Sequence, residues 1–141
     1  MTKDEVLRII LDTKVIAVIR MADTEKLAKV IEAVQKGGVR AIEITMTTPG
    51  ALGVIKNISE QREPGVVIGA GTVLDPETAE SVIRAGAEFV VSPVLNKKVI
   101  KLCNDYGKMV APGAMTPTEI LKAWQKGADI VKIFPATSLG P

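Results

Sequence analysis

The chain has 141 residues, carries 18 Lys and Arg against 16 Asp and Glu, and contains one cysteine and no histidine. Its 47% of hydrophobic residues is enough to build the core of one domain of ordinary size. The balanced charge and the 3% of aromatic residues argue against a nucleic-acid partner, and the missing histidine argues against a metal-dependent hydrolase.

The first residues show no signal for export or membrane insertion. Residues 1–5 are mostly polar and lead into an amphipathic stretch, whereas a signal peptide would continue into an apolar segment. No uninterrupted apolar run approaches the ~20 residues of a membrane-spanning helix. The single Cys103 cannot form an internal disulfide. We therefore expect a soluble cytoplasmic protein with no membrane partner.

Short β-rich runs alternate with helical patterns along the whole chain. The runs predict six strands, over residues 15–20, 39–45, 66–70, 88–92, 108–111 and 129–134. Their onsets lie on average about 23 residues apart, a spacing that suits the βα units of a parallel sheet and is too short for separate domains. The sequence thus predicts an α/β fold of repeated strand–helix units.

Prolines and glycines mark the expected helix boundaries. A polar residue precedes a proline at the start of three helices, in Thr48–Pro49, Asp75–Pro76 and Thr116–Pro117. Glu119 stands three residues after Thr116, so this pair predicts a capping box. Glycines stand where helices should end, at Gly37–Gly38, Gly86, Gly107 and Gly127.

Charged residues inside the predicted strands favour a barrel over an open sheet. Glu43 shares a strand face with Thr45 and Thr47. Lys132 interrupts the apolar sixth strand, and Arg20 closes the first. A parallel strand covered by helices on both faces should be apolar throughout, whereas a (β/α)8 barrel places its active site at the carboxyl ends of its strands. An open sheet stays the alternative; it would be supported if the first and sixth strands lay far apart and helices covered both faces of the sheet.

The length of the chain does not suffice for a complete barrel. Eight units of this size need roughly 200 residues. We therefore expect residues 1–141 to form a single, incomplete TIM-barrel domain with about six βα units.

Lys132 and Glu43 are the candidate catalytic pair. A lysine enclosed by apolar residues loses hydration of its ammonium form and becomes available as a neutral amine, which Schiff-base formation requires. Glu43 in the same barrel interior would supply proton transfer. Two structural alternatives stay open at this point: the Lys132 ammonium reaches solvent at a strand edge, or the two residues form an ion pair.

The segment Gly69-Ala-Gly-Thr72 ends the third strand and is a candidate anion site. Gly69 and Gly71 let a carboxylate or phosphate approach the backbone, and the Thr72 hydroxyl can donate to it. The alternative is a strand-to-helix turn with unusual dihedral angles. Cys103 falls in the apolar pattern of a helix and is expected to be a core residue.

Several segments together resemble the bacterial 2-keto-3-deoxy-6-phosphogluconate (KDPG) and 4-hydroxy-2-oxoglutarate aldolases. The segments occur in the order and spacing of that family and are Glu43–Thr45, Gly69–Val73, Ser92–Pro93, Pro112–Gly113, Met115–Glu119 and Val131–Pro135. The lysine strand followed by Phe-Pro is the most specific of them.

The resemblance implies a class I aldolase on a (β/α)8 barrel, usually a homotrimer, that needs neither a metal nor an organic cofactor. Its substrate would be a small 2-keto acid: KDPG, cleaved to pyruvate and glyceraldehyde 3-phosphate, and also 4-hydroxy-2-oxoglutarate, cleaved to pyruvate and glyoxylate. An aldolase for the galactonate epimer of KDPG is the nearest alternative. A non-catalytic fragment or engineered scaffold is the alternative from another class.

The resemblance also implies roles for single residues. Lys132 corresponds to the Schiff-base lysine and Glu43 to the acid/base residue. Thr72, together with Gly71, would hold the pyruvyl carboxylate, and Pro93 and Phe134 would line the pocket.

Two departures from the family pattern concern anion binding. Thr47 stands where a number of members carry a carboxylate-binding arginine, and Arg20 at the end of the first strand is a candidate to replace it. The family binds the substrate phosphate with residues of strands seven and eight, so no phosphate-binding residue is assigned here.

Overall fold

The computed structural model describes residues 1–138 and 140, and the side chains of all of these apart from residues 24 and 25. Within this part of the chain, five parallel strands form one sheet, in the spatial order of the sequence. They are β1 (Ile16–Ile19), β2 (Ala41–Thr45), β3 (Val67–Gly71), β4 (Phe89–Val91) and β5 (Met109–Ala111). A further parallel pair, β6 (Gly113–Ala114) with β7 (Lys132–Ile133), follows β5 after Pro112.

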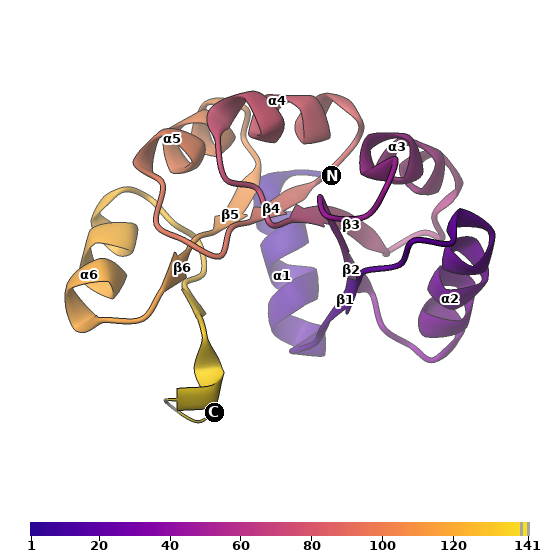
Figure 1. Cartoon of the computed structure of the whole chain (residues 1–141), viewed down its shortest axis with the longest axis horizontal. Helices are drawn as coiled ribbons and strands as arrows, with labels where there is room; N and C mark the ends of the chain where they lie inside the picture. The colour runs from indigo at the N-terminus through magenta and orange to yellow at the C-terminus, as the bar shows by residue number, and fades with distance from the viewer. Residues whose placement is uncertain (139, 141) are drawn as a thin grey trace.

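The helices separate into two groups around these strands. One helix follows each strand from β1 to β4, and another follows β6; they are α2 (Thr24–Lys36), α3 (Ala51–Gln61), α4 (Pro76–Arg84), α5 (Lys97–Asp105) and α6 (Pro117–Gln125). Figure 1 shows these helices along the outside of a curved row of strands, with α1 (Lys3–Thr13) on the inside. A 3-10 turn, η1 (Ala136–Ser138), follows β7.

This arrangement is the arc of a barrel. A doubly wound open sheet would carry the crossover helices on both faces and would reverse its strand order, and neither occurs among the described elements. The expected barrel topology is therefore confirmed, with β1 and the β6–β7 pair at the two ends of the arc. No helix among the described residues has the length and apolar character to cross a membrane.

Alternate residues of each strand enter two different cores. Ile42, Ile68 and Val90 face the outer helices and share a cluster with Leu27 and Cys103. The inward-facing residues of β2–β5 form the second cluster with Val6 and Ile10 of α1, and they are Ala41, Val67, Phe89, Val91, Met109 and Ala111. Because α1 covers the amino-terminal part of the inner face, the carboxyl ends of the strands stay open for a site.

Helix α1 is stabilised by a cap at its start and by contacts of Lys3 with distant residues. Thr2 and Glu5 form a capping box at its start. Lys3 then ties the helix to the far end of the arc, because its Nζ lies 2.9 Å from a carboxylate oxygen of Asp129 and 2.6 Å from Oδ1 of Asn104.

Three local expectations prove wrong. The described residues hold seven strands and not six, because the short β6 (Gly113–Ala114) was not predicted. The third helix does not begin at Thr48–Pro49; its N-cap is Gly50, in the left-handed region, and the helix starts at Ala51. The last strand is confined to Lys132–Ile133 instead of spanning residues 129–134. The caps at Asp75 and Thr116, the latter with its Glu119 box, are confirmed.

Apolar side chains are exposed at both ends of the arc. Val18 on β1, in register with Glu43, is 55% exposed. At the other end, Leu121 and Trp124 on α6 are 57% and 52% exposed. Apolar side chains at both ends therefore lack the neighbours that a closed barrel would supply.

Candidate active site

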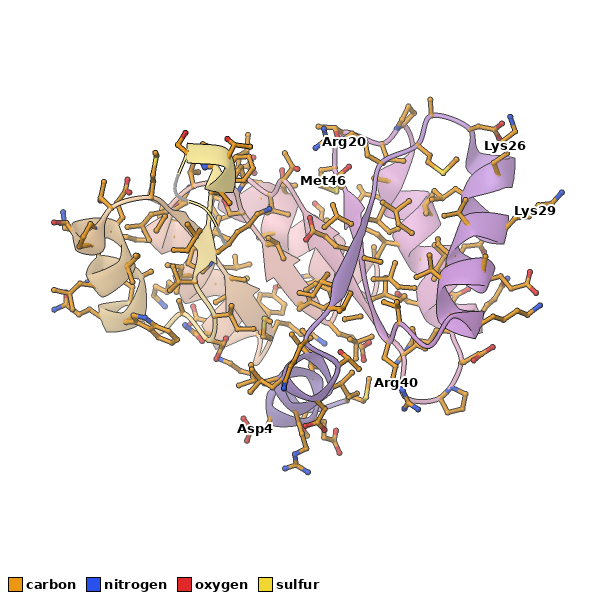
Figure 2. All side chains as sticks on the ribbon, turned by 90° about the horizontal axis from the view of Figure 1, so that it is seen from below. Asp4, Arg20, Lys26, Lys29, Arg40 and Met46 are labelled. Carbon is orange, nitrogen blue, oxygen red and sulfur yellow. The ribbon has the colours of Figure 1, made fainter. Side chains whose placement is uncertain are left out.

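Glu43 lies in the middle of β2 and Lys132 at the start of β7, and Arg20 directly follows β1. Register places Glu43 of β2 beside Val18 of β1 and Gly69 of β3, and Lys132 of β7 beside Gly113 of β6. In Figure 2, Arg20 and Met46 lie at this end of the molecule, whereas Arg40, just before β2, lies at the other. The strand parity read from the sequence thus brings the predicted charged residues to one rim.

Glu43 is an enclosed carboxyl group, with 3% of its surface exposed. Burial raises its pKa, and the positive charges of Lys132 and then Arg20 act in the opposite direction without cancelling that effect. A carboxyl group of this kind holds a proton at a higher pH than an exposed glutamate does. That property suits a residue which both takes up and releases protons.

Lys132 is half-buried, not enclosed as the apolar run around it suggested, because Ile133 and Phe134 are 39% and 46% exposed. Its backbone N–H donates to the carbonyl oxygen of Pro112 at 2.9 Å, which fixes the strand edge. Its Nζ lies 5.0 Å from the centroid of the Phe134 ring, within the range of a cation–π contact.

Lys132 and Glu43, both described, do not form the ion pair considered as a structural alternative. The charge of Lys132 still acts on the pKa of Glu43, so the two side chains share one electrostatic environment. The amine is therefore not tied to the carboxylate in a salt bridge.

A group of threonine hydroxyls connects Arg20 to this rim. Nε of Arg20 lies 3.5 Å from Oγ1 of Thr45, which is also 3.0 Å from Oγ1 of Thr47 and 3.4 Å from Oγ1 of Thr48. Thr47 was expected on the strand with Glu43; it lies instead in the turn that follows β2, since the strand ends at Thr45. Arg20 is exposed and presents a cation at the rim.

The sequence placed Thr45 on the Glu43 face and predicted Thr48 as a helix cap, but it assigned neither of them a role in the site. Both are buried, at 1% and 3% exposure, and their hydroxyls contact each other. The strand parity that singled out Glu43 also includes Thr45, so that signal was available. The inward turn of Thr48 has no counterpart in the sequence pattern.

The remaining candidates lie at neighbouring strand ends. Thr72 follows Gly71 and has a φ of 60°, in the left-handed region that a non-glycine residue seldom adopts. Pro93 and Phe134 line one hollow of about 280 Å³ together with Gly113, Met115 and Pro135. Lys132 and Glu43 are not among the residues lining this hollow.

Cys103 lies in the outer core, as expected. It is fully buried, and burial raises the pKa of its thiol to about 12. Among the described residues, no three His, Cys, Asp or Glu side chains gather in a way that could hold a metal ion.

Comparison with known proteins assigns the family. Residues 6–141 match the family described as KDPG and KHG aldolase. The chain belongs to this aldolase family. Its fold is accordingly the α/β TIM-barrel type of the solved KDPG aldolases.

Relatives give the same result one by one. The 2-dehydro-3-deoxy-phosphogluconate aldolase of Treponema pallidum is 39% identical over 127 residues, 90% of this chain and 60% of the relative. The 2-dehydro-3-deoxy-6-phosphogalactonate aldolase of Escherichia coli is 35% identical over 126 residues, 89% of this chain and 62% of the relative.

Among solved structures, the KDPG aldolase of Legionella pneumophila, with pyruvate captured as a covalent carbinolamine intermediate, matches with a TM-score of 0.81 at 30% identity. The match covers 89% of this chain and 60% of that one. The chain thus spans about 60% of the length of these aldolases.

Proposed function

We propose that this chain carries the Schiff-base chemistry of a class I aldolase that cleaves KDPG to pyruvate and glyceraldehyde 3-phosphate. Lys132 is the nucleophile and Glu43 the acid/base residue. The observation that carries the proposal is the buried Glu43 carboxyl group of raised pKa, on which the charge of Lys132 acts although the described residues show no ion pair between the two. A single domain of residues 1–141 supplies both groups, and neither a metal nor an organic cofactor takes part.

The steps follow from the chemistry of the two groups. The neutral amine of Lys132 adds to the C2 ketone, and the carbinolamine takes up a proton and loses water to give an iminium ion. Glu43 then removes the proton of the C4 hydroxyl, directly or through a water, and the electrons of the C3–C4 bond move into the iminium. The aldehyde leaves and an enamine of pyruvate remains. Protonation of C3 and hydrolysis release pyruvate and regenerate the amine.

Substrate binding is assigned to the rim around this pair. Thr72 and the backbone at Gly71 hold the pyruvyl carboxylate, with Arg20 as the cation and Thr47 beside it; Pro93 and Phe134 line the pocket. The contact of Arg20 with Thr45 supports this placement, because it holds the guanidinium at the carboxyl end of β2. The covalent carbinolamine named for the Legionella relative supports an adduct with pyruvate.

Reductive trapping tests the nucleophile. Incubation with pyruvate and borohydride should fix a pyruvyl mass on the peptide that contains Lys132, and Lys132→Arg should abolish the label. Lys97→Arg, which changes an exposed lysine at the start of α5, is the matched control and should keep it. Label on another lysine, or none on the folded chain, would contradict the assignment.

The epimer of the substrate is a second candidate, because the E. coli galactonate aldolase, at 35% identity, is nearly as similar as the Treponema gluconate aldolase, at 39%. Cleavage rates on the two C4 epimers, measured on one preparation, decide between them. Equal failure on both epimers, with imine trapping intact, would favour unphosphorylated 4-hydroxy-2-oxoglutarate as the substrate. Absence of both trapping and cleavage would instead favour the non-catalytic scaffold.

We also propose that the protein acts in the cytoplasm as a homotrimer, as the family resemblance implies. Sedimentation equilibrium tests the trimer, which requires three times the mass of 15.0 kDa. A monomer at all concentrations would contradict it.

A further inference from the structure

Strand β3 leaves two positions on the inner face without a side chain. Val67, Gly69 and Gly71 share that face, and only Val67 contributes to the inner core. Each vacant position is filled from a neighbouring strand. A Cβ built on Gly69 would collide with the ring of Phe89 on β4, and one built on Gly71 would collide with Oε1 of Glu43 on β2.

The backbone itself does not demand glycine at residue 71. Gly71 belongs to the extended strand and is not one of the described glycines with a positive φ. The three atoms nearest to the hypothetical Cβ are Oε1, Cδ and Cγ of Glu43, and all three belong to the end of that one side chain. An added methyl group would therefore displace the Glu43 carboxyl, because no other residue supplies an atom as close to it.

We infer that Gly71 is a positioning residue for Glu43: the side chain missing from β3 is the space in which the Glu43 carboxyl group lies. The catalytic part of this inference rests on the proposed function. The contact between Gly71 and Glu43 is independent of that function. In this position the carboxyl of Glu43, on β2, lies against Gly71 of β3.

The space beside Gly71 accounts for the burial of the Glu43 carboxyl group. In a Gly71→Ala variant, the added methyl group would push the Glu43 carboxyl off β3 toward the open inner face. The carboxyl would regain water there, which lowers its pKa toward the usual range. The charged groups that act on it are Arg20, at the end of β1, and Lys132, on β7. Both positive charges favour the carboxylate form of Glu43. They therefore act in the same direction as the regained water, and the pKa of Glu43 should fall.

Titration of the free protein tests the contact without any activity. With 13C-labelled glutamate, the side-chain carboxyl signal of Glu43 is identified by its loss in Glu43→Gln and followed against pH. We expect a lower apparent pKa in Gly71→Ala than in the parent chain. Gly53→Ala is the matched control, because its Cβ would enter open space on α3 and should leave the titration unchanged. An unchanged Glu43 titration in folded Gly71→Ala would overturn the inference.

Hydrogen exchange at the methyl group of pyruvate tests the catalytic consequence. Exchange with deuterated water needs both the imine on Lys132 and a base that removes the C3 proton. Gly71→Ala should keep imine trapping, lower the exchange rate by ~10²-fold as expected for a base misplaced by about 1 Å, and move the acid limb of the pH–rate profile to lower pH. Loss of trapping together with exchange would overturn the inference, because the added methyl group would then disturb the carboxylate-binding backbone at Gly71 and not the Glu43 carboxyl alone.

Two controls separate the possible failures. If the parent chain forms no imine with pyruvate, the proposed function fails, while the substrate-free titration still decides the inference. If Gly71→Ala does not fold, the double variant Gly71→Ala/Glu43→Asp is compared by circular dichroism, since aspartate is one methylene shorter. Recovery of the fold supports the steric conflict with Glu43, and continued failure overturns it.

Discussion

Two opposing effects act on the pKa of Glu43: burial raises it, and the positive charges of Lys132 and Arg20 lower it. If it performs the proton transfers, its replacement should impair turnover far more than binding. Glu43→Gln is expected to lower kcat by ~10²–10⁴-fold, the range for loss of a general acid/base, while imine trapping on Lys132 persists. Steady-state kinetics beside borohydride trapping measure both.

Glu60→Gln is the matched control for this change, because Glu60 is an exposed residue of α3. It should leave kcat unchanged. A Glu43→Gln variant with the parent kcat would refute the assigned role.

The raised pKa of Glu43 also makes the stability of the fold depend on pH. An acid whose folded-state pKa exceeds its unfolded value stabilises the fold fully below the unfolded value, and that contribution is lost as the pH rises through the folded value. Glu43→Gln does not titrate there. Its free energy of unfolding, relative to the parent chain, should therefore be higher at about pH 7 than at about pH 4. Urea unfolding at the two pH values measures the difference, and a constant offset would contradict the burial argument.

The site residues show how far sequence reasoning reaches at this scale. Parity along a strand placed Glu43 and Lys132 on the inner face, because side chains alternate between the two faces. The contact of the Glu43 carboxyl with Gly71 depends on the conformation of the Glu43 side chain, which reaches the next strand. No spacing in the sequence encodes that conformation. The half-exposure of Lys132 likewise depends on Ile133 and Phe134 lacking neighbours.

Helix starts are the elements that the sequence encoded best. Asp75 and Thr116 cap α4 and α6 with Pro76 and Pro117 at the first helical positions. At Thr48 the same pattern failed, because the Thr48 hydroxyl turns inward to Oγ1 of Thr45 and is buried. A side chain engaged with the strand that precedes it cannot also cap the helix that follows.

The cap of α6 can be measured directly. Thr116 accepts a hydrogen bond from the Glu119 N–H at 3.3 Å, and Glu119 accepts one from the Thr116 N–H at 2.9 Å. Thr116→Ala should lower the free energy of unfolding by ~1 kcal/mol, the usual cost of losing an N-cap side chain. Thr118→Ala, an exposed position in the same turn, should cost less. Urea titrations of the two variants decide it, and equal costs would mean that the cap contributes nothing of its own.

At the scale of the whole molecule, the open arc leaves two strand edges without partners. Unpaired edges with apolar side chains pair readily with other chains, and a lysine on an edge strand opposes this. We expect the 141-residue chain to associate beyond a trimer as its concentration rises, and Val18→Lys to reduce that association. Leu52→Lys, on the outer helix α3 and 41% exposed, is the control and should not. Light scattering across a concentration series measures it; equal association of both variants would place the contact elsewhere.

The sequential strand order was predictable because each βα unit repeats the same local signals. The extent of the opening was not, since it depends on which side chains meet across the arc. Val18 and Trp124 are of residue types common in protein cores, and only the structure shows that they are 55% and 52% exposed.

The Cys103 thiol can report when helix α5 separates from the sheet. The thiol is fully enclosed between α5 and the sheet, and its high pKa keeps it in the unreactive protonated form. It is also the only cysteine in the chain. A thiol-specific reagent can therefore modify the protein only after α5 separates from the strands, so the kinetics of modification follow a single structural event. When reclosing outpaces modification, each tenfold slowing relative to an unfolded thiol corresponds to about 1.4 kcal/mol of opening free energy.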